Sequence, residues 1–172
     1  MDASVLVRPA RLDEVTYIIE LIDRVQKQLA EAGSLQVIGP IPYEIASERV
    51  SAGNAFVLEL GGRLAGSVFV RPVTAESCPH LERWQLIDVV SKPWFLQKLA
   101  LEPALQGQGS GYHFLAGLKK LLARRDPGAT IFLDCWAGNT NLRNFYTRAG
   151  FSLYGIFPEH DYSLAVFTST VL

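Results

Sequence analysis

A glycine-rich turn near the middle of the sequence constrains the fold most. The apolar residues 94–101 predict a strand, and the apolar periodicity of residues 109–124 predicts a helix. Between them the chain carries glycines at positions 107, 109 and 111. Glycines leave backbone N–H groups unobstructed at the start of a helix, where unpaired amides and the helix dipole favour an anion. The sequence therefore predicts an α/β protein with a site for a pyrophosphate at this turn.

The spacing within the turn separates three phosphate-binding patterns. A dinucleotide fingerprint needs glycine at position 112, which is Tyr112, and a P-loop needs Gly-Lys followed by Ser or Thr. Neither lysine nor threonine follows Gly111. The pattern that remains is Gln106-x-x-Gly109-x-Gly111 after an apolar strand. Because a glycine-rich turn before a helix often serves packing alone, this pattern is only suggestive by itself.

The other elements predict a mixed sheet with helices on both faces. We expect further strands at residues 5–7, 55–60, 63–71, 131–136, 152–157 and 162–171, and further helices at residues 13–32 and 141–148, with a weaker helix within 40–53. Arg8-Pro9 should close the first strand, and Gly61-Gly62 predicts a tight hairpin turn. Residues 73–92 predict a long irregular connection, in which residues 83–90 could extend a strand.

Size and charge limit the classes of function. The 172 residues, 49% of them hydrophobic and 19% charged, predict a single domain over residues 1–172 with an apolar core. The formal net charge of -1 disfavours binding to nucleic acid or to an anionic membrane. No segment reaches the roughly 18 uncharged apolar residues of a membrane span, so we expect no membrane association.

The two cysteines argue against stabilisation by disulfides or metal. Cys78 and Cys135 lie far apart, with no second Cys or His at metal-ligand spacing. We therefore expect no disulfide framework, no zinc site and a reducing, cytoplasmic location. Cys135 should be an inert buried thiol, and Cys78 has no obvious activating partner, so covalent catalysis through cysteine is not expected.

A second motif lies one helix and one strand downstream of the glycine turn. The strand Leu133-Asp134-Cys135-Trp136 continues through Ala137-Gly138-Asn139 toward Phe145-Tyr146 and Ala149-Gly150-Phe151. With the first motif, it resembles the GNAT superfamily of acyl-CoA-dependent N-acetyltransferases, whose pyrophosphate loop reads Gln/Arg-x-x-Gly-x-Gly/Ala. The resemblance extends over the whole chain, with only residues 73–92 unusual. It implies a GNAT-type α/β fold: a mixed, mostly antiparallel sheet of six or seven strands, covered by helices on both faces and splayed between strands 94–101 and 131–136.

The resemblance also assigns roles to residues. It implies that the pantetheine arm of acetyl-CoA pairs with the exposed backbone of the strand at Leu99, Ala100 and Leu101. The pyrophosphate would contact the backbone amides of Gln106, Gly107, Gln108, Gly109, Ser110 and Gly111. Asn139 would hydrogen-bond the pantetheine arm. Tyr146 would contact the cofactor and act as the general acid, because a phenol of pKa about 10 can protonate a thiolate whose conjugate acid lies near 8.5.

Structural alternatives stand beside these roles. Asn139 could cap the following helix, Tyr146 could be half-buried packing, and the side chains of Leu99 and Leu101 could be plain core. Phe145 and Phe151 are predicted to be core rather than site, on their helical spacing to Leu142.

The general base is not located by sequence. Glu102, Asp134, Glu82 and His80 are the candidates, and each could equally be a solvated surface charge. Asp134 and Trp136 alternate with their strand neighbours and so share a face, which could line the acceptor cleft or pack beneath the first helix.

The resulting hypothesis is an acetyltransferase that uses acetyl-CoA as its acyl-donor cosubstrate, with no metal. The acetyl group would pass directly to an amine, and near-neutral charge favours a small-molecule acceptor. The alternatives are a protein or peptide N-acetyltransferase and a catalytically silent acyl-CoA-binding module. An acyl group longer than acetyl is also open. Family members are often dimers, so the resemblance also implies a homodimer.

Overall fold

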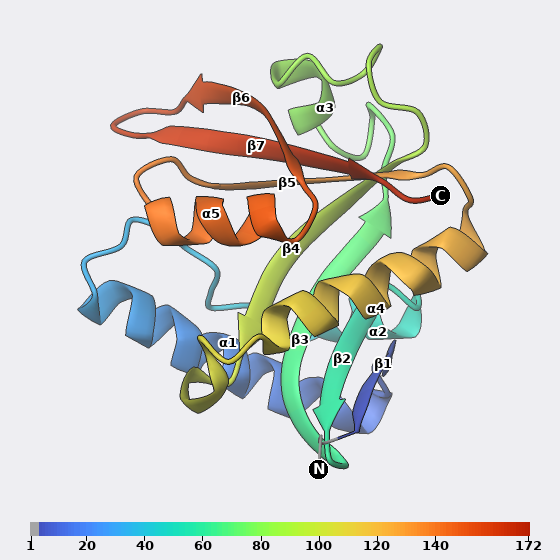
Figure 1. The fold of residues 1–172 in the computed structure, drawn as a ribbon, viewed down its shortest axis with the longest axis vertical. Helices are drawn as coiled ribbons and strands as arrows, with labels where there is room; N and C mark the ends of the chain where they lie inside the picture. Colours follow the sequence, from blue (N-terminus) through green and yellow to red (C-terminus); the bar gives the residue numbers. More distant parts are fainter. Residues whose placement is uncertain (1–3) are drawn as a thin grey trace. The chain divides into compact units, whose positions relative to one another are not determined.

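The computed structural model describes residues 4–172, which form seven strands in one mixed sheet. The strand order is β1-β2-β3-β4-β5-β7-β6 (Figure 1). Pairing is parallel between β4 and β5, and antiparallel for β1–β2, β2–β3, β5–β7 and β6–β7. The strands are β1 (Val5–Pro9), β2 (Ala55–Leu60), β3 (Arg63–Pro72), β4 (Pro93–Leu101), β5 (Thr130–Trp136), β6 (Ser152–Pro158) and β7 (Ser163–Thr170). This sheet confirms the expected fold class.

Five α-helices and two short 3-10 helices connect these strands in the described part of the chain. They are η1 (Leu12–Glu14), α1 (Val15–Glu31), α2 (Tyr43–Ser51), α3 (His80–Arg83), η2 (Pro103–Leu105), α4 (Ser110–Arg125) and α5 (Thr140–Arg148). The helices expected at residues 13–32, 109–124 and 141–148 are therefore confirmed, as is the weaker one within 40–53. None of the helices in residues 4–172 has the length and apolar character needed to cross a bilayer.

The chain divides into two compact units. The first contains Met1–Val70 and Gln97–Leu118, and the second contains Arg71–Leu96 and Lys119–Leu172. Strand β4 and helix α4 therefore each contribute residues to both units.

In the first unit, helices cover both faces of β1, β2 and β3. The buried side chains of α1 and α2 pack with Val57, Phe69 and Ala100 in one core cluster. On the other face, α4 comes so close to the strands that a Cβ on Gly117 would lie 2.4 Å from Val7. A Cβ on Gly66 would likewise lie 3.2 Å from Phe114 and 2.9 Å from the carbonyl oxygen of Ala100.

The ends of β1 and of the β2–β3 hairpin illustrate what the sequence predicted well and less well. Gly61 and Gly62 have φ of 58° and 81°, so the tight turn expected there is confirmed. Strand β1 also ends at Arg8-Pro9 as expected, but these two residues belong to the strand, and Pro9 pairs with Phe56. Proline is tolerated because β1 is an edge strand with only one neighbour, β2.

The start of α1 is fixed by a buried carboxylate. Glu14 accepts two hydrogen bonds from Arg8, at 2.9 and 2.7 Å, and one at 2.8 Å from the backbone N–H of Arg11. The hydrogen bonds from Arg8 are the main reason why the pKa of Glu14 lies below its ordinary value. The side chain of Glu14 is only 7% exposed, so its hydrogen bonds to Arg8 are shielded from water. These bonds join the start of α1 to β1.

In the second unit, β5, β7 and β6 are covered on one face by α5 and on the other by the segment around α3 (Figure 1). Phe167 of β7 contacts Tyr146 of α5, whereas Phe132 of β5 contacts Trp84 beside α3. The first residues of β4 pair in parallel with β5, from Pro93 opposite Thr130 to Phe95 opposite Phe132.

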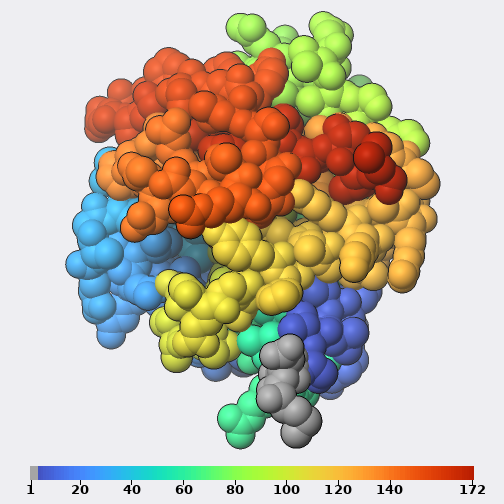
Figure 2. Space-filling model, in the orientation of Figure 1, coloured from blue at the N-terminus to red at the C-terminus, as the bar shows by residue number. Residues whose placement is uncertain are grey.

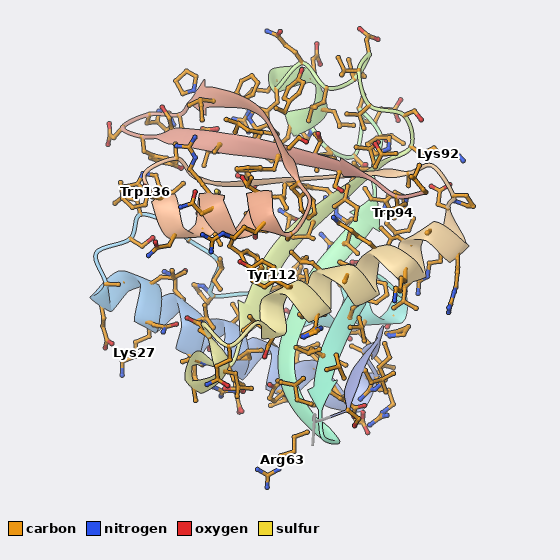
Figure 3. The ribbon with its side chains drawn as sticks, in the orientation of Figure 1. Lys27, Arg63, Lys92, Trp94, Tyr112 and Trp136 are labelled. Carbon is orange, nitrogen blue, oxygen red and sulfur yellow. The ribbon has the colours of Figure 1, made fainter. Side chains whose placement is uncertain are left out.

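The turn between α4 and β5 is anchored to the start of β4. Trp94 donates its indole N–H to Asp126 at 2.9 Å, and Lys92 lies 3.3 Å from the same carboxylate. The side chains of Lys92 and Trp94 are labelled near the C-terminal end of α4 in Figure 3. The hydrogen bond from Trp94 is the main reason why the pKa of Asp126 is lowered.

The strand suggested for residues 83–90 is wrong. The segment contains the end of α3 and a series of turns, with the N–H of Leu86 bonded to the carbonyl of Leu81 at 2.8 Å. Trp84 is fully buried, and its ring contacts Phe95, Phe132 and Phe157. The burial of Trp84 among aromatic side chains that are distant in sequence favours the turns of residues 83–90 over a strand. The local sequence pattern carries no information about this burial.

Candidate functional site

The glycine turn lies in the first unit between β4 and α4. Gly107 and Gly109 have φ of 80° and 85°, in the left-handed region that favours glycine. A Cβ at either position would meet no atom within 4 Å, so backbone conformation rather than crowding requires glycine here. Helix α4 begins at Ser110, one residue later than expected. The first amides of a helix are not used by its own hydrogen-bond ladder, which is why a helix start can bind an anion.

The turn is accessible, and its long side chains are directed back to the protein. Gln106, Gly107 and Gln108 are exposed, and this part of the chain is the yellow surface in Figure 2. Gln106 donates its amide N–H to the Oε1 of Gln28 at 3.0 Å, and Gln108 donates to the carbonyl of Ala104 at 3.2 Å. An anion at this turn would therefore meet mainly backbone N–H groups.

The strand that precedes the turn has an irregular backbone. Lys98 has φ of 59°, in a region that a residue with a side chain rarely adopts within a strand. After it, Ala100 is buried in the core cluster with α1, while Leu99 and Leu101 are half-buried. The side chain of Leu101 would lie 2.9 Å from a Cβ on Gly66. These side chains pack against the unit, so any role toward pantetheine falls to the backbone.

Glu102 is already engaged in contacts within the first unit. Its Oε1 accepts a hydrogen bond of 2.9 Å from the hydroxyl of Tyr17 and one of 2.6 Å from Arg24. The sequence named Glu102 among the candidate bases, and these contacts show that its carboxylate has a structural role. Burial, followed by the hydrogen bond to Glu102, raises the pKa of Tyr17 well above its ordinary value, so this phenol remains a donor.

Asn139 begins α5 in the second unit. Its Oδ1 accepts the backbone N–H of Leu142 at 3.0 Å, which is the geometry of an N-cap. The capping alternative is therefore confirmed. A cap uses only the side-chain oxygen, and the amide N–H groups of Asn139 are still chemically able to donate to a ligand.

Tyr146 is the buried residue of α5. It is 5% exposed, and its ring contacts those of Phe145, Phe151 and Phe167 at centroid distances of 5.2, 5.8 and 5.8 Å. Burial raises its pKa far above the ordinary value, and the nearby groups of Cys135 and Asp134 raise it further. The phenol therefore stays protonated and can serve only as a proton donor near neutral pH.

Residues 134–136 of β5 include the thiol and one of the carboxylates considered from sequence. Cys135 is fully buried, as expected, and burial raises the pKa of its thiol to about 12. Asp134 and Trp136 are half-buried on the same side of the strand. Trp136, labelled in Figure 3, has its indole ring 2.5 Å from where a Cβ on Gly138 would lie. Glycine at position 138 therefore lets the chain turn tightly beneath this ring.

The other residues raised from sequence lie around α3. Cys78 is buried with its Sγ 3.7 Å from the Nδ1 of His80, and both cysteines are free thiols. Burial lowers the pKa of His80, whose ring contacts that of Trp84 in a tilted arrangement, with a centroid distance of 4.6 Å. Glu82 is exposed. This cluster packs within the second unit, and in residues 4–172 no group of three or more His, Cys, Asp or Glu is arranged to hold a metal.

Sequence reasoning did not single out Lys119 of α4. Its Nζ donates to the carbonyl of Ala149, at the end of α5, at 2.8 Å, and lies 4.4 Å from the ring centroid of Phe151. A cation at the C-terminus of a helix stabilises it. Burial lowers the pKa of Lys119. No local signal could have found this contact, because Lys119 and Lys120 look alike in an amphipathic helix.

Comparison with known families gives a match over most of the chain. The acetyltransferase (GNAT) family model matches residues 22–151, which include both sequence motifs. No curated protein matches the chain.

Solved structures share the fold at low sequence identity. A GNAT-family acetyltransferase from Listeria monocytogenes 4b F2365 superposes with a TM-score of 0.75 and 22% identity, covering 96% of this chain and 94% of that one. A Salmonella typhimurium acetyltransferase that modifies the N-terminal serine of ribosomal protein L7/L12 has a TM-score of 0.70, 17% identity and coverage of 98% and 95%. An agmatine N-acetyltransferase variant has a TM-score of 0.69, 16% identity and coverage of 96% and 99%.

Proposed function

This chain belongs to the GNAT family of acetyltransferases, and on that basis we propose that it transfers the acetyl group of acetyl-CoA directly to an amine. Membership makes the chain an acyltransferase. The observation that carries the proposal is the accessible glycine turn at the start of α4, inside the family match. Its glycines take positive φ and the side chain of Gln106 is bonded to Gln28, which supports binding of a ligand through backbone N–H groups.

The turn fits the pyrophosphate of acetyl-CoA. A Cβ at Gly107 or Gly109 would meet no atom within 4 Å, so the space next to the backbone is open at these positions. We propose that the amides of residues 106–111 hold the pyrophosphate and that the backbone of residues 99–101 pairs with the pantetheine arm. Both groups of contacts use the main chain, which explains why the local side chains are free to pack elsewhere.

In the proposed reaction, the amine nitrogen forms a bond to the acetyl carbon and the carbon–sulfur bond breaks. Acetyl-CoA supplies the thioester as acyl donor. Tyr146 gives its phenolic proton to the departing sulfur, and its raised pKa keeps that proton in place until then. The buried thiol of Cys135, with a pKa of about 12, is not a nucleophile, which favours direct transfer without an acyl-enzyme.

A base must take the proton that the amine loses. Among the carboxylates considered from sequence, Glu102 is engaged with Tyr17 and Arg24. Asp134 lies on the face of β5 that carries Phe132, whereas Tyr146 packs on the opposite face, against Phe167. We therefore assign the base to neither carboxylate.

The acceptor is proposed to be a small amine. Near-neutral net charge supports this, and the agmatine enzyme with the same fold shows that the architecture accommodates small amines. The structural neighbour that modifies a ribosomal protein N-terminus supports a peptide acceptor as the second candidate. Thiol release from acetyl-CoA should be followed with a panel of polyamines, amino acid amides and short peptides. A higher kcat/KM for small amines supports the first candidate, and a higher value for peptide N-termini overturns it.

A further inference from the structure

One face of α1 contacts the segment that leads into the glycine turn. Tyr17, Arg24 and Gln28 are spaced by seven and four residues, so they lie along the same side of the helix. The first two contact Glu102, directly before η2, and the third contacts Gln106, directly after it. The helix therefore holds the chain at two points on either side of a short 3-10 turn.

These contacts are specific hydrogen bonds. Glu102 receives the Tyr17 hydroxyl at 2.9 Å and the Arg24 guanidinium at 2.6 Å, and its side chain is only 24% exposed. The Arg24 guanidinium lies 5.9 Å from the Tyr17 ring centroid. Gln106 donates to Gln28 at 3.0 Å and to the carbonyl of Leu101 at 3.4 Å.

The turn beyond these contacts also has a local hydrogen bond, from Gln108 to the carbonyl of Ala104 at 3.2 Å. Residues 106–108 are exposed. Positions 107 and 109 are glycines with positive φ, and glycine has more backbone freedom than any other residue type. A flexible turn loses conformational entropy when it closes on a ligand, and prior ordering removes that cost from binding. Anchors at Glu102 and Gln106 restrict the turn before the ligand arrives.

The charges add a second effect. A lone carboxylate at Glu102, close to the turn in sequence, would repel an anionic pyrophosphate, whereas Arg24 neutralises it at 2.6 Å. Loss of Arg24 alone should therefore weaken binding more than loss of the Glu102 charge alone. Removal of both should restore part of the affinity.

We propose that this set of contacts, the α1 clamp, positions the pyrophosphate turn for the nucleotide half of acetyl-CoA. Its members are Tyr17, Arg24, Gln28, Glu102 and Gln106. They are positioning residues and do not touch the reacting atoms. The inference rests on the proposed function, since it concerns the same turn, and it predicts that the clamp acts on KM for acetyl-CoA and not on kcat.

The test compares two acyl donors. S-acetyl-pantetheine carries the same thioester as acetyl-CoA but lacks the pyrophosphate and nucleotide. Glu102→Gln should raise KM for acetyl-CoA roughly fivefold and Arg24→Met roughly tenfold, with kcat within about twofold of wild type. The kcat/KM for S-acetyl-pantetheine should not change, and Arg24→Met/Glu102→Gln should fall between the single variants. Tyr17→Phe, which keeps the ring, should give a milder rise in KM.

Asp13→Asn is the matched control, because it removes an exposed carboxylate of the same unit that pairs with Arg11. It should leave both donors unaffected. Equal loss with both donors, or unchanged KM for acetyl-CoA in all clamp variants, would overturn the clamp while leaving the proposed function intact. Failure of the wild type to bind acetyl-CoA in isothermal titration would instead overturn the proposed function and this inference with it.

Discussion

The glycine turn of the first unit and helix α5 of the second unit carry the two sequence motifs by opposite physical means. The turn is exposed, takes positive φ at Gly107 and Gly109, and presents backbone. Around α5 the important groups are side chains: Tyr146 is buried among aromatic rings, and Asn139 already caps the helix. A motif that acts through backbone groups depends on a few glycines. A motif that acts through buried side chains requires the same residues to have both structural and chemical roles.

This difference explains why the second motif was harder to interpret. Packing and capping were offered as alternatives to a functional role for Tyr146 and Asn139, and the structure shows that both residues do pack or cap. These roles do not exclude chemistry, because a hydroxyl or an amide N–H can act while the ring packs or the oxygen caps. Substitutions that remove one role at a time separate them.

The largest effect is expected from Tyr146→Phe. The phenylalanine ring keeps the contacts with Phe151 and Phe167 but cannot donate a proton. We expect kcat to fall about 100-fold or more, with the acetyl-CoA Kd and the melting temperature near wild type. Steady-state kinetics, isothermal titration and thermal unfolding measure the three quantities. An unchanged kcat would remove the general-acid role and leave Tyr146 as packing alone.

The raised pKa of Tyr146 adds a pH dependence to the same comparison. The protonated phenol is the active form, and a raised pKa keeps it protonated above the ordinary tyrosine value of about 10. Wild-type kcat should therefore not decline as pH approaches 10 on account of this residue. A decline centred well below that value, absent from Tyr146→Phe, would contradict the buried environment.

The glycine turn should respond to backbone strain and not to loss of a side chain. Gly109→Ala forces a residue with a Cβ into φ of 85°, at a cost of about 1–2 kcal/mol, and should raise the acetyl-CoA Kd about tenfold while saturated kcat is kept. Gln108→Ala, the control, removes an exposed side chain and its hydrogen bond to the carbonyl of Ala104 but leaves the backbone φ unstrained, so it should change Kd less than about twofold. A larger effect from Gln108→Ala would show that side chains, not amides, bind the ligand.

Two substitutions separate the capping role of Asn139 from its proposed role in binding pantetheine. Asn139→Ala removes the cap and should lower the unfolding free energy by about 1 kcal/mol, whereas Asn139→Asp keeps an oxygen for the N–H of Leu142 and should be near wild type. If the amide N–H groups also bind pantetheine, Asn139→Asp retains stability and loses acetyl-CoA affinity. Denaturant unfolding and isothermal titration distinguish the outcomes. Full affinity in a stable Asn139→Asp variant would leave Asn139 as a cap only.

The smallest effect concerns Lys119 beneath α5. Burial lowers its folded-state pKa below the unfolded value, so the folded state binds fewer protons over the interval between the two. The cost of burying the charge is fully present below the folded pKa, and stability rises as pH increases from there toward the unfolded value. Lys119→Met should lack this alkaline gain in unfolding free energy. Parallel pH profiles for the two proteins would contradict it.

Much of the fold was predictable because it is encoded locally. The hairpin at Gly61-Gly62, the amphipathic α1 and the strand-turn-helix before α4 all have a period or a turn residue that the structure confirms. The strand suggested for residues 83–90 was wrong because Trp84 is buried by residues of β5 and β6 that lie far away in sequence. The single domain over residues 1–172 stays a prediction.

The site shows the same division. The spacing of its glycines predicts the turn from sequence. The contacts from α1 to Glu102 and Gln106 join residues 78 or more positions apart, and no local sequence pattern predicts them. Lys119 and its bond to Ala149 are invisible for the same reason. Roles that depend on tertiary contacts could only follow from the structure, and the roles of individual residues toward acetyl-CoA stay predictions.

The most direct test of the central claim is amine-dependent release of CoA thiol from acetyl-CoA by the wild-type protein, with the product identified by mass spectrometry. The account predicts that thiol release requires an amine and yields an acetylated nitrogen, at a rate that Tyr146→Phe lowers about 100-fold or more. Tight acetyl-CoA binding without amine-dependent release, for any small amine or peptide tested, would contradict it and identify a catalytically silent acyl-CoA-binding module.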